Sequence, residues 1–393
     1  MRSPHLRKKL TPFGTTIFAE MTELALLHDA INLSQGFPDE DGPDFLREAA
    51  AHALLEGPNQ YARSRGVPAL CSAIAADLGA RYGLEVDPLR EVGVFSGATE
   101  AIFAAMQGIL NPGDEVVILE PFYDCYPAAV VMAGGIPRYH TLKWPDFRLS
   151  ADALEASFSD KTRMLIVNTP HNPSGRVFTR EELAGIAELC TKYDVLVLGD
   201  EVYEHLVYDG PHTPIATLPG MWERTITVSS IGKTLSVTGW KIGWAYGHSA
   251  LMDALQAAHQ FITFSTTTPL QHALARVLPL AASWIDGLRE RYRRKRDTLV
   301  QALRDIGFSL TPPEGTYFIL ADISGFGFDD DVAFARYLTR EIGVACIPPS
   351  AFYAEGREEG RRLARFAFCK RDATLEAAVA RLRTLDDGAA RIR

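Results

Sequence analysis

Small and polar residues follow short apolar runs at several places in the chain. The segment SGAT (96–99) follows VGVF, NTPHNPSG (168–175) follows RMLIV, Asp200 follows VLVLG, and SSIGKT (229–234) extends the run TITV. In open α/β sheets, ligands bind outside the carboxyl ends of the strands, so groups at these positions are expected to meet at one edge of a sheet. Two side-chain groups in these segments can take part directly in a reaction. They are the amine of Lys233 and the carboxylate of Asp200.

The residue types in these segments match the functional groups of one cofactor. A lysine amine such as that of Lys233 can form a Schiff base with a carbonyl compound. The backbone N–H groups of SGAT, at the start of a helix, can hold a phosphate. A carboxylate such as that of Asp200 can keep a pyridine nitrogen protonated, and Asn172 and Tyr203 can donate hydrogen bonds to a phenolic oxygen. Pyridoxal 5'-phosphate carries all four partners, so the sequence indicates a site for this cofactor.

Each of these segments is ambiguous when it is taken alone. SGAT could be an ordinary helix N-cap, and Asp200 could be a paired acid of the core. GKT resembles the end of a P-loop, but that motif requires a glycine five residues before Gly232, where the sequence has Thr227. Independent turns would not be expected to supply complementary groups at successive strand ends, so the prediction rests on their combination.

Hydrophobic patterning predicts the elements that position these residues. Short apolar runs predict strands over 92–95, 116–119, 163–167, 195–199 and 225–229, and helices are predicted over 45–56, 67–82 and about 99–110. Thr179 and Glu182 form a capping box that predicts the start of a helix ending near Tyr193. Strands that alternate with helices are typical of a mostly parallel sheet covered on both faces.

The pattern changes after about residue 280. A long basic helix is predicted over 284–306, strand-like runs over 316–321, 343–348 and 362–368, and a last helix over about 373–385. The sequence therefore predicts an α/β fold with two domains. The large domain (44–283) is expected to have three layers, αβα, with a mostly parallel sheet, and the smaller α/β domain is expected to combine 1–43 with 284–393.

With these motifs in place, the chain resembles the pyridoxal-phosphate-dependent aminotransferases of fold type I, class I and II. Within them it looks most like the kynurenine/glutamine or methionine/aromatic aminotransferase branch. The resemblance is carried by INLSQGFPD (31–39), NQYARSRG (59–66), GATEAI (97–102), EPFYD (120–124), NTPHNPSG (168–175), DEVYE (200–204), SSIGKTLSVTGWKIGW (229–244) and RFAFCK (365–370). The ordered set extends from Ile31 to about Leu385 and is specific, whereas GAT or GKT alone would be weak.

The resemblance implies a role for each matching residue. The implied catalytic residues are Lys233, as Schiff-base lysine and general acid/base, Asp200, as partner of the ring nitrogen, and Tyr203. The implied cofactor-binding residues are Gly97, Ala98, Thr99, Tyr123, Asn172, Asp200, Tyr203, Ser230, Lys233, Lys241 and Tyr61. Tyr61 is expected to reach the phosphate in a neighbouring subunit, which implies a homodimer. A cis peptide bond is expected before Pro173.

An arginine is expected to bind the substrate. Arg365 lies in a strand-like run, where it shares one face with Ala367 and lies opposite Phe366 and Phe368. An arginine on an otherwise apolar strand needs a partner, and its planar fork suits a carboxylate, although a structural salt bridge is the alternative. Together with the resemblance, this argument predicts the substrate-binding residues Gly36, Asn172, Arg365, Phe18 and Phe264.

The expected activity is transfer of an amino group from an L-amino acid to a 2-oxo acid by a ping-pong mechanism. The pocket candidates are Phe18, Tyr61, Tyr123 and Phe264. Because all of them are aromatic and uncharged, kynurenine, glutamine, methionine and phenylalanine are favoured over aspartate. Glu40 stands where related sequences usually carry an aromatic residue, and Ser265 stands where some carry a histidine, so either could change the substrate choice.

Two other functions remain open at this point. A cysteine-conjugate C–S β-lyase uses the same cofactor and the same proton abstraction, and differs in releasing a leaving group from Cβ. A non-catalytic effector module of a transcription regulator is a remote alternative. It would normally carry a DNA-binding domain, and the segment before INLSQG (31–36) is too short for a helix-turn-helix.

Composition narrows the class of protein. The chain has 393 residues, of which 47% are hydrophobic and 23% charged, as is typical of a soluble globular protein with two or three structural units. A net charge of −9 argues against nucleic acid as a partner, and five scattered cysteines favour reduced thiols in the cytoplasm. MRSPHLRKKL (1–10) does not resemble a secretory signal. No apolar run predicts a membrane span, and no side-chain cluster predicts a metal site.

Overall fold

The computed structural model describes residues 13–14, 16–354 and 358–385. The N-terminal segment that was considered as a secretory signal lies outside the described residues, and so do parts of the predicted smaller domain. Within the described ranges, no helix is both long enough and apolar enough to cross a membrane.

The centre of the molecule is a seven-stranded sheet with the order β2-β8-β7-β6-β5-β3-β4. Its strands are β2 (Val92–Phe95), β3 (Glu115–Glu120), β4 (Ile136–Thr141), β5 (Thr162–Asn168), β6 (Leu196–Asp200), β7 (Thr225–Ser230) and β8 (Gly243–Gly247). Strand β8 is antiparallel to β2 and to β7, and the other neighbours are parallel. The carboxyl ends of β2, β5, β6 and β7 therefore meet at one edge of the sheet.

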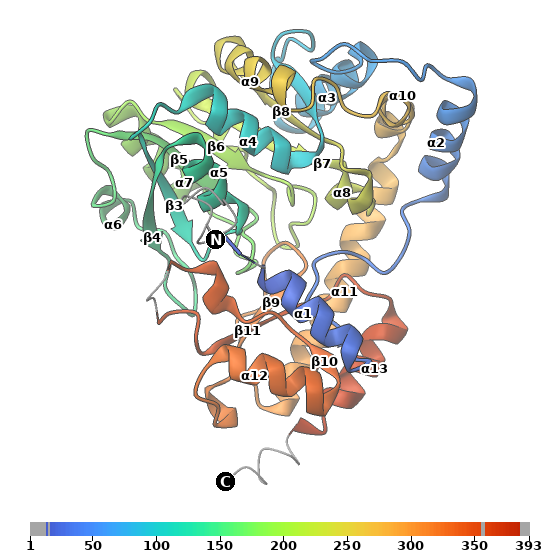
Figure 1. The fold of residues 1–393 in the computed structure, drawn as a ribbon, viewed down its shortest axis with the longest axis vertical. Helices are drawn as coiled ribbons and strands as arrows, with labels where there is room; N and C mark the ends of the chain where they lie inside the picture. Colours follow the sequence, from blue (N-terminus) through green and yellow to red (C-terminus); the bar gives the residue numbers. More distant parts are fainter. Residues whose placement is uncertain (1–12, 15, 355–357, 386–393) are drawn as a thin grey trace, which may run out of the picture.

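Helices cover both faces of this sheet (Figure 1). One face packs against α4 (Gly97–Ile109), α5 (Cys125–Ala133) and α9 (Ser249–Ile262), and the other packs against α6 (Ala151–Glu155) and α7 (Arg180–Lys192). Within β3, Val116 and Ile118 belong to the first of these cores, whereas Val117 and Leu119 belong to the second. A strand buried on both sides has this alternation. The predicted three-layer αβα arrangement with a mostly parallel sheet is confirmed.

A third core lies where β2 and β8 meet two further helices. Val94 and Trp244 from these strands pack with side chains of α3 (Pro68–Tyr82) and α10 (Thr268–Val277). Helix α10 in turn contacts α2 (Asp44–Glu56).

The C-terminal elements build a separate hydrophobic core together with part of the N-terminal segment. They are β9 (Phe318–Asp322), β10 (Val344–Ala345), β11 (Leu363–Ala367), α11 (Ala282–Ile306), α12 (Asp331–Tyr337) and α13 (Asp372–Leu382). Strand β9 pairs with β11, and β10 pairs with β1 (Ile31–Asn32). In Figure 1 these elements lie below the large sheet, with α1 (Ile17–Leu27) beside them. The positions of the two domain boundaries stay predictions.

The sequence analysis missed two strands of the large sheet. Strand β4 (IPRYHT) lies at the edge, is partly exposed and has polar residues, so it does not show as an apolar run. Strand β8 (GWAYG) is short and begins and ends with glycine. A Cβ at Gly243 would lie 2.5 Å from the backbone nitrogen of Ala98, so only glycine lets β8 pass the start of α4.

The predicted run over 343–348 is a strand only at Val344–Ala345. Ile347 still forms an isolated bridge with Arg365, but Pro348 and Pro349 follow, and proline cannot donate to a ladder.

Candidate active site

A cavity of about 310 Å³ lies at the carboxyl edge of the large sheet. Its lining includes these predicted site residues: Phe18, Gly36, Gly97, Ala98, Thr99, Tyr123, Asn172, Asp200, Tyr203, Ser230, Lys233, Lys241 and Arg365. Lys233 and Asp200 thus face the same space, and its volume is in the range of small-molecule sites.

Asp200, at the end of β6, is a buried carboxylate held by neutral donors. The hydroxyl of Tyr126 donates to its Oδ2 at 2.6 Å, and the backbone N–H of Val202 donates to its Oδ1 at 3.3 Å. In the part of the chain that the structure describes, no ion pair joins it to a cation. Burial raises the pKa of Asp200 to about 6, against the lowering effect of the bond from Tyr126. The carboxylate is therefore placed to pair with a cationic group of a ligand.

Lys233 lies in α8 (Ile231–Thr234), directly after β7. Its Nζ donates to the backbone oxygen of Gly36 at 3.4 Å and lies 5.7 Å from the ring centre of Tyr203 and 5.6 Å from that of Tyr317. Desolvation lowers the pKa of Lys233 to about 8. An amine with this pKa is in part unprotonated near neutral pH, which both a nucleophile and a general base require.

The start of α4 offers an anion site. Ser96 is the N-cap residue, but its hydroxyl donates to Oγ1 of Thr266 at 3.0 Å and does not cap the helix. The N–H groups of the first helical turn therefore remain for a ligand. Gly97 has a φ of +82°, and a Cβ there would lie 3.2 Å from Nζ of Lys241. A glycine is thus needed for the turn, and a lysine ammonium lies beside the helix end.

Arg365, in β11, is buried. Its Nη1 donates to Oδ1 of Asn172 at 3.1 Å, its Nη2 donates to the backbone oxygen of Ser34 at 2.9 Å, and its Nε has no partner in the described part of the chain. Burial lowers the pKa of Arg365 to about 10. Among the described residues no ion pair involves this guanidinium, so the alternative of a structural salt bridge is not observed. A buried guanidinium with a free donor suits the carboxylate of a ligand.

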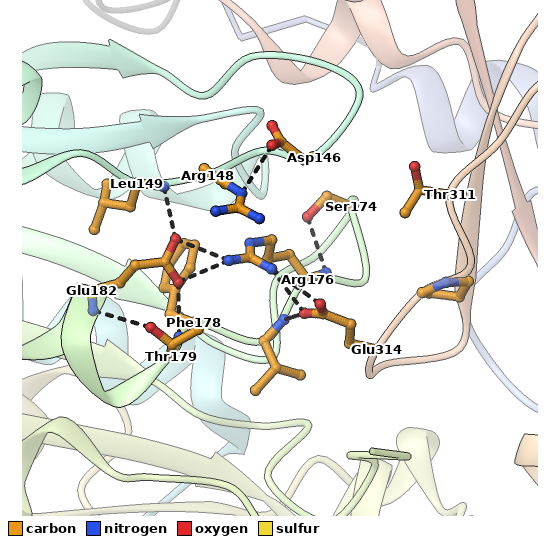
Figure 2. A network of polar contacts seen from close by, with 12 residues as sticks. Asp146, Arg148, Leu149, Ser174, Arg176, Phe178, Thr179, Glu182, Thr311 and Glu314 are labelled. Carbon is orange, nitrogen blue, oxygen red and sulfur yellow. Dashed lines mark hydrogen bonds and ion pairs between the residues drawn. The ribbon is translucent and has the colours of Figure 1, made fainter. Parts of the chain in front are cut away.

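The loop that carries Asn172 is tied down at its base (Figure 2). Arg176 donates through Nη2 to both carboxylate oxygens of Glu182 at 2.9 Å, and through Nη1 to those of Glu314 at 3.0 and 3.2 Å. Glu182 also completes the predicted capping box with Thr179 at the start of α7. The Asn172–Pro173 peptide bond is cis, as predicted. The loop is therefore held to α7 and to the segment before β9.

Two of the predicted residues lie outside this cavity. The rings of Tyr61 and Phe264 contact each other edge to face, with centres 5.3 Å apart, and the two side chains are 83% and 43% exposed. The role of Tyr61 in a neighbouring subunit stays a prediction, and so does that of Phe264 in substrate binding. Glu40 and Ser265 do not line the cavity either, and Glu40 lies 3.4 Å from Nζ of Lys295.

The structure also shows three polar residues at the site that the sequence analysis missed. They are Tyr126, which bonds Asp200, Tyr317, whose hydroxyl donates to the backbone oxygen of Gly36 at 2.6 Å, and Asn168. The side-chain amide of Asn168 donates to the backbone oxygen of Asp200, and its Oδ1 accepts from the backbone N–H of Asn172. A signal existed for Asn168, which opens the motif NTPHNPSG, but no local pattern points to the two tyrosines.

Residues 28–382 match the family described as aminotransferase class I and II. The chain belongs to the class I and II aminotransferases. It is 45% identical to a probable N-succinyldiaminopimelate aminotransferase of Mycobacterium tuberculosis, over 96% of this chain and 98% of the relative. A solved structure of N-succinyldiaminopimelate aminotransferase from that organism has a TM-score of 0.94 and 45% identity, and covers 97% of this chain and 100% of the other.

Other class I and II aminotransferases resemble the chain almost as strongly. The methionine aminotransferase of Escherichia coli is 42% identical over 96% of this chain and 98% of its own. Kynurenine–oxoglutarate transaminase 3 of Mus musculus is 42% identical over 94% of this chain and 88% of its own. The protein is thus a transaminase of fold type I, in the branch that the sequence predicted, and it depends on pyridoxal phosphate.

The residues at the site fit the cofactor that this aminotransferase family uses. Asp200 has no cationic partner within the described ranges, which leaves this carboxylate available for a protonated ring nitrogen. Helix α4 presents uncapped N–H groups beside Lys241, where a phosphate would be neutralised. Lys233 brings an amine of lowered pKa into the same cavity. The donor set therefore matches the phosphate, the ring nitrogen and the aldehyde of the cofactor.

Proposed function

We propose that this aminotransferase moves the amino group of an aromatic, sulfur-containing or neutral L-amino acid to a 2-oxo acid by a ping-pong mechanism. Kynurenine, glutamine, methionine and phenylalanine are donors of this type. The charge of the cavity carries the proposal. The cations among its described lining residues are Lys233, Lys241 and Arg365, and each has a task with the cofactor or the α-carboxylate. None is left for a carboxylate on the substrate side chain.

Aromatic rings form much of the remaining wall. They belong to Phe18, Phe37, Tyr123, Tyr126, Tyr203 and Phe318. Such a wall favours an apolar or aromatic side chain, because burial of its surface is favourable and no unpaired charge results.

Each polar residue has a task in this proposal. Arg365 binds the α-carboxylate of the substrate, assisted by Asn172 and by the backbone at Gly36. Lys233 moves the proton at Cα, for which its lowered pKa is suited. The buried guanidinium and the desolvated amine line one cavity, so a substrate held by Arg365 would share that cavity with the base.

Pyridoxal phosphate, when bound, supplies an aldehyde for the amino group and a ring that withdraws electrons from Cα. Lys233 would hold the aldehyde, and Asp200 would face the ring nitrogen. Tyr203 and Asn172 would donate to the phenolic oxygen, and Tyr123 would stack on the ring. The phosphate would be held by Gly97, Ala98, Thr99, Ser230, Lys241 and Tyr61 of the partner subunit.

A homodimer in the cytoplasm is part of the proposal. Tyr61 and Phe264 are in contact, and Phe261 (86% exposed) and Ile262 (48% exposed) lie at the end of α9, shortly before Phe264 in the chain. We infer that these four residues form one apolar patch. A patch of this kind on a protein surface marks an interaction site. A second copy of the chain would cover it and would bring Tyr61 to the other active site.

A donor screen tests the substrate class. Kynurenine, methionine, phenylalanine, glutamine and aspartate are each supplied with 2-oxoglutarate or with a 2-oxo-4-methylthio acid, and N-succinyldiaminopimelate is added because a relative is named for it. The neutral donors should give the highest kcat/KM. The Lys233→Ala variant serves as the blank. Faster turnover of aspartate or of N-succinyldiaminopimelate would contradict the proposal.

The β-lyase remains the alternative reaction for the same site. Release of pyruvate and ammonia from a cysteine conjugate, without an added 2-oxo acid, would reveal it. Transfer that depends on the 2-oxo acid supports transamination as the main reaction.

A further inference from the structure

A buried ion pair lies directly behind the start of α4. The side chain of His259, in α9, is fully buried, and that of Glu100, in the first turn of α4, is 7% exposed. Nδ1 of His259 lies 2.6 Å from Oε1 of Glu100, and Nε2 lies 3.0 Å from the backbone oxygen of Ser64. The other carboxylate oxygen of Glu100 accepts the backbone N–H of Ser96 at 2.5 Å.

The partners of the ring determine its charge. The backbone oxygen of Ser64 can only accept a hydrogen bond, so Nε2 of His259 carries a proton. Nδ1 of His259 and Oε1 of Glu100 share a second proton, and with that proton on the ring the contact is an ion pair between an imidazolium and a carboxylate. Burial raises the pKa of Glu100, but the bonds from His259 and from the Ser96 N–H outweigh it and keep this pKa below its ordinary value.

A lone carboxylate at this place would oppose the binding of an anion. Glu100 bonds the residue that precedes Gly97, so its charge lies at the N-terminal end of the helix. A negative charge there offsets the positive end of the helix dipole and would repel a phosphate. The carboxylate nevertheless accepts a hydrogen bond from the backbone N–H of Ser96, whereas the hydroxyl of Ser96 donates to Thr266.

We propose that His259 is a positioning residue for cofactor binding: its positive charge neutralises Glu100, so that the start of α4 can accept the phosphate dianion. The inference rests on the proposed function, in which this helix end binds the phosphate. The same ring holds Ser64, whose hydroxyl also accepts from Gln256, and so fixes the loop that carries Tyr61. The pair thus links the phosphate site to the segment that is expected to reach the partner subunit.

His259→Asn tests the charge. An asparagine amide can still donate to Glu100 but carries no charge. The full-length protein is freed of cofactor and titrated with pyridoxal phosphate or with pyridoxal, while the absorbance of the bound aldehyde is followed. We expect the Kd for pyridoxal phosphate to rise on the order of tenfold, because the uncompensated charge of Glu100 repels the phosphate and the protein screens this repulsion only in part. The Kd for pyridoxal, which has no phosphate, should change much less.

Glu100→Gln provides the matched rescue. Glutamine can accept the Ser96 N–H and can donate to a neutral His259, so Glu100→Gln alone should leave phosphate binding unchanged or tighter. In the His259→Asn background it should restore the affinity for pyridoxal phosphate. A purely structural role predicts the opposite: equal losses for both cofactors and a double variant no better than the single one. Either result would overturn the proposal. If His259→Asn does not fold, His259→Gln, which is also uncharged, replaces it in the same measurements.

Lys241→Gln separates this inference from the proposed function. If the phosphate lies at the start of α4, this substitution should weaken the binding of pyridoxal phosphate much more than the binding of pyridoxal. If Lys241→Gln shows this preference and His259→Asn does not, the role of His259 is wrong and the phosphate site stands. If neither variant shows it, the phosphate site itself is wrong and the role of His259 falls with it.

Discussion

At the scale of single residues, the site keeps ionisable groups where their charges are disfavoured. Burial raises the pKa of Asp200 to about 6, and desolvation lowers that of Lys233 to about 8. Both changes destabilise the protein without its cofactor, because a charged group that has lost its hydration is not fully compensated. A cofactor that pairs with Asp200 removes part of this cost. Function at this site is thus obtained at the expense of stability.

Asp200→Asn should make the cofactor-free protein more stable at neutral pH. A carboxyl whose pKa is raised on folding contributes fully to stability below its unfolded pKa of 3.8, and this contribution is lost as the pH rises through about 6. The loss amounts to about 3 kcal/mol for a difference of this size. Thermal unfolding of wild type and variant should therefore differ at pH 7.5 and agree near pH 4. Equal stability at pH 7.5 would contradict the prediction, and turnover should fall strongly in the variant.

Arg365→Ala should impair the binding of every α-amino acid. The loss of a charge-assisted contact with the α-carboxylate should raise KM by about 10- to 100-fold. The absorbance of the bound cofactor should stay, because the proposal assigns Arg365 to the α-carboxylate and not to the cofactor. Arg371→Ala is the matched control, since this arginine follows in the same segment but its side chain is 64% exposed. A KM that rises for one class of donor alone would contradict a role at the α-carboxylate.

At the scale of elements, the active-site side chains come from short segments that follow strands. The loop after β5 carries Asn172, and Arg176 ties it to Glu182 and Glu314 (Figure 2). These two carboxylates belong to different parts of the chain, so one guanidinium fixes the loop on two sides. Loops of this kind are rigid only when such contacts hold them.

Arg176→Gln should loosen this loop and destabilise the protein. Removal of the guanidinium leaves Glu182 and Glu314 without their shared partner, and the loss of one member of a largely buried ion pair costs about 3 kcal/mol. Thr179→Ala, which removes only the N-cap of α7, should cost about 1 kcal/mol. Urea unfolding measures both. A smaller effect for Arg176→Gln than for Thr179→Ala would show that the ion pairs do not hold the loop.

At the scale of the whole molecule, the apolar patch of Tyr61, Phe261, Ile262 and Phe264 is the surface expected to meet a second copy. Two residues after Phe264, the hydroxyl of Thr266 accepts from Ser96 beside the start of α4. Assembly and catalysis are therefore expected to depend on each other.

Phe261→Asp should shift the protein to a monomer and reduce turnover. A charge on a buried dimer contact is unfavourable because it would lose its hydration without a partner. Sedimentation velocity measures the oligomeric state. Leu27→Asp is the control and should change neither property, because Leu27 is 75% exposed and belongs to α1, a helix that lies beside the C-terminal elements (Figure 1). A dimer that persists in Phe261→Asp would place the interface elsewhere.

The elements of this fold were predictable where their hydrophobic pattern is local. The strand that carries Asp200 is an apolar run, the strand before Lys233 alternates β-branched residues, and the capping box of Thr179 is complete within four residues. Strands β4 and β8 were missed because an edge position and close packing against α4 replaced the apolar pattern with polar residues and glycine.

The sequence by itself determined the family, the cofactor and the segments from which the site is built, because each of these is encoded in residue types at short, fixed spacing. Only the tertiary structure showed that Tyr126 bonds Asp200, that Tyr317 bonds the backbone of Gly36, and that His259 bonds Glu100. These contacts join positions far apart in the chain. Such a contact depends on how layers and helices pack, and no local pattern of residues records that packing.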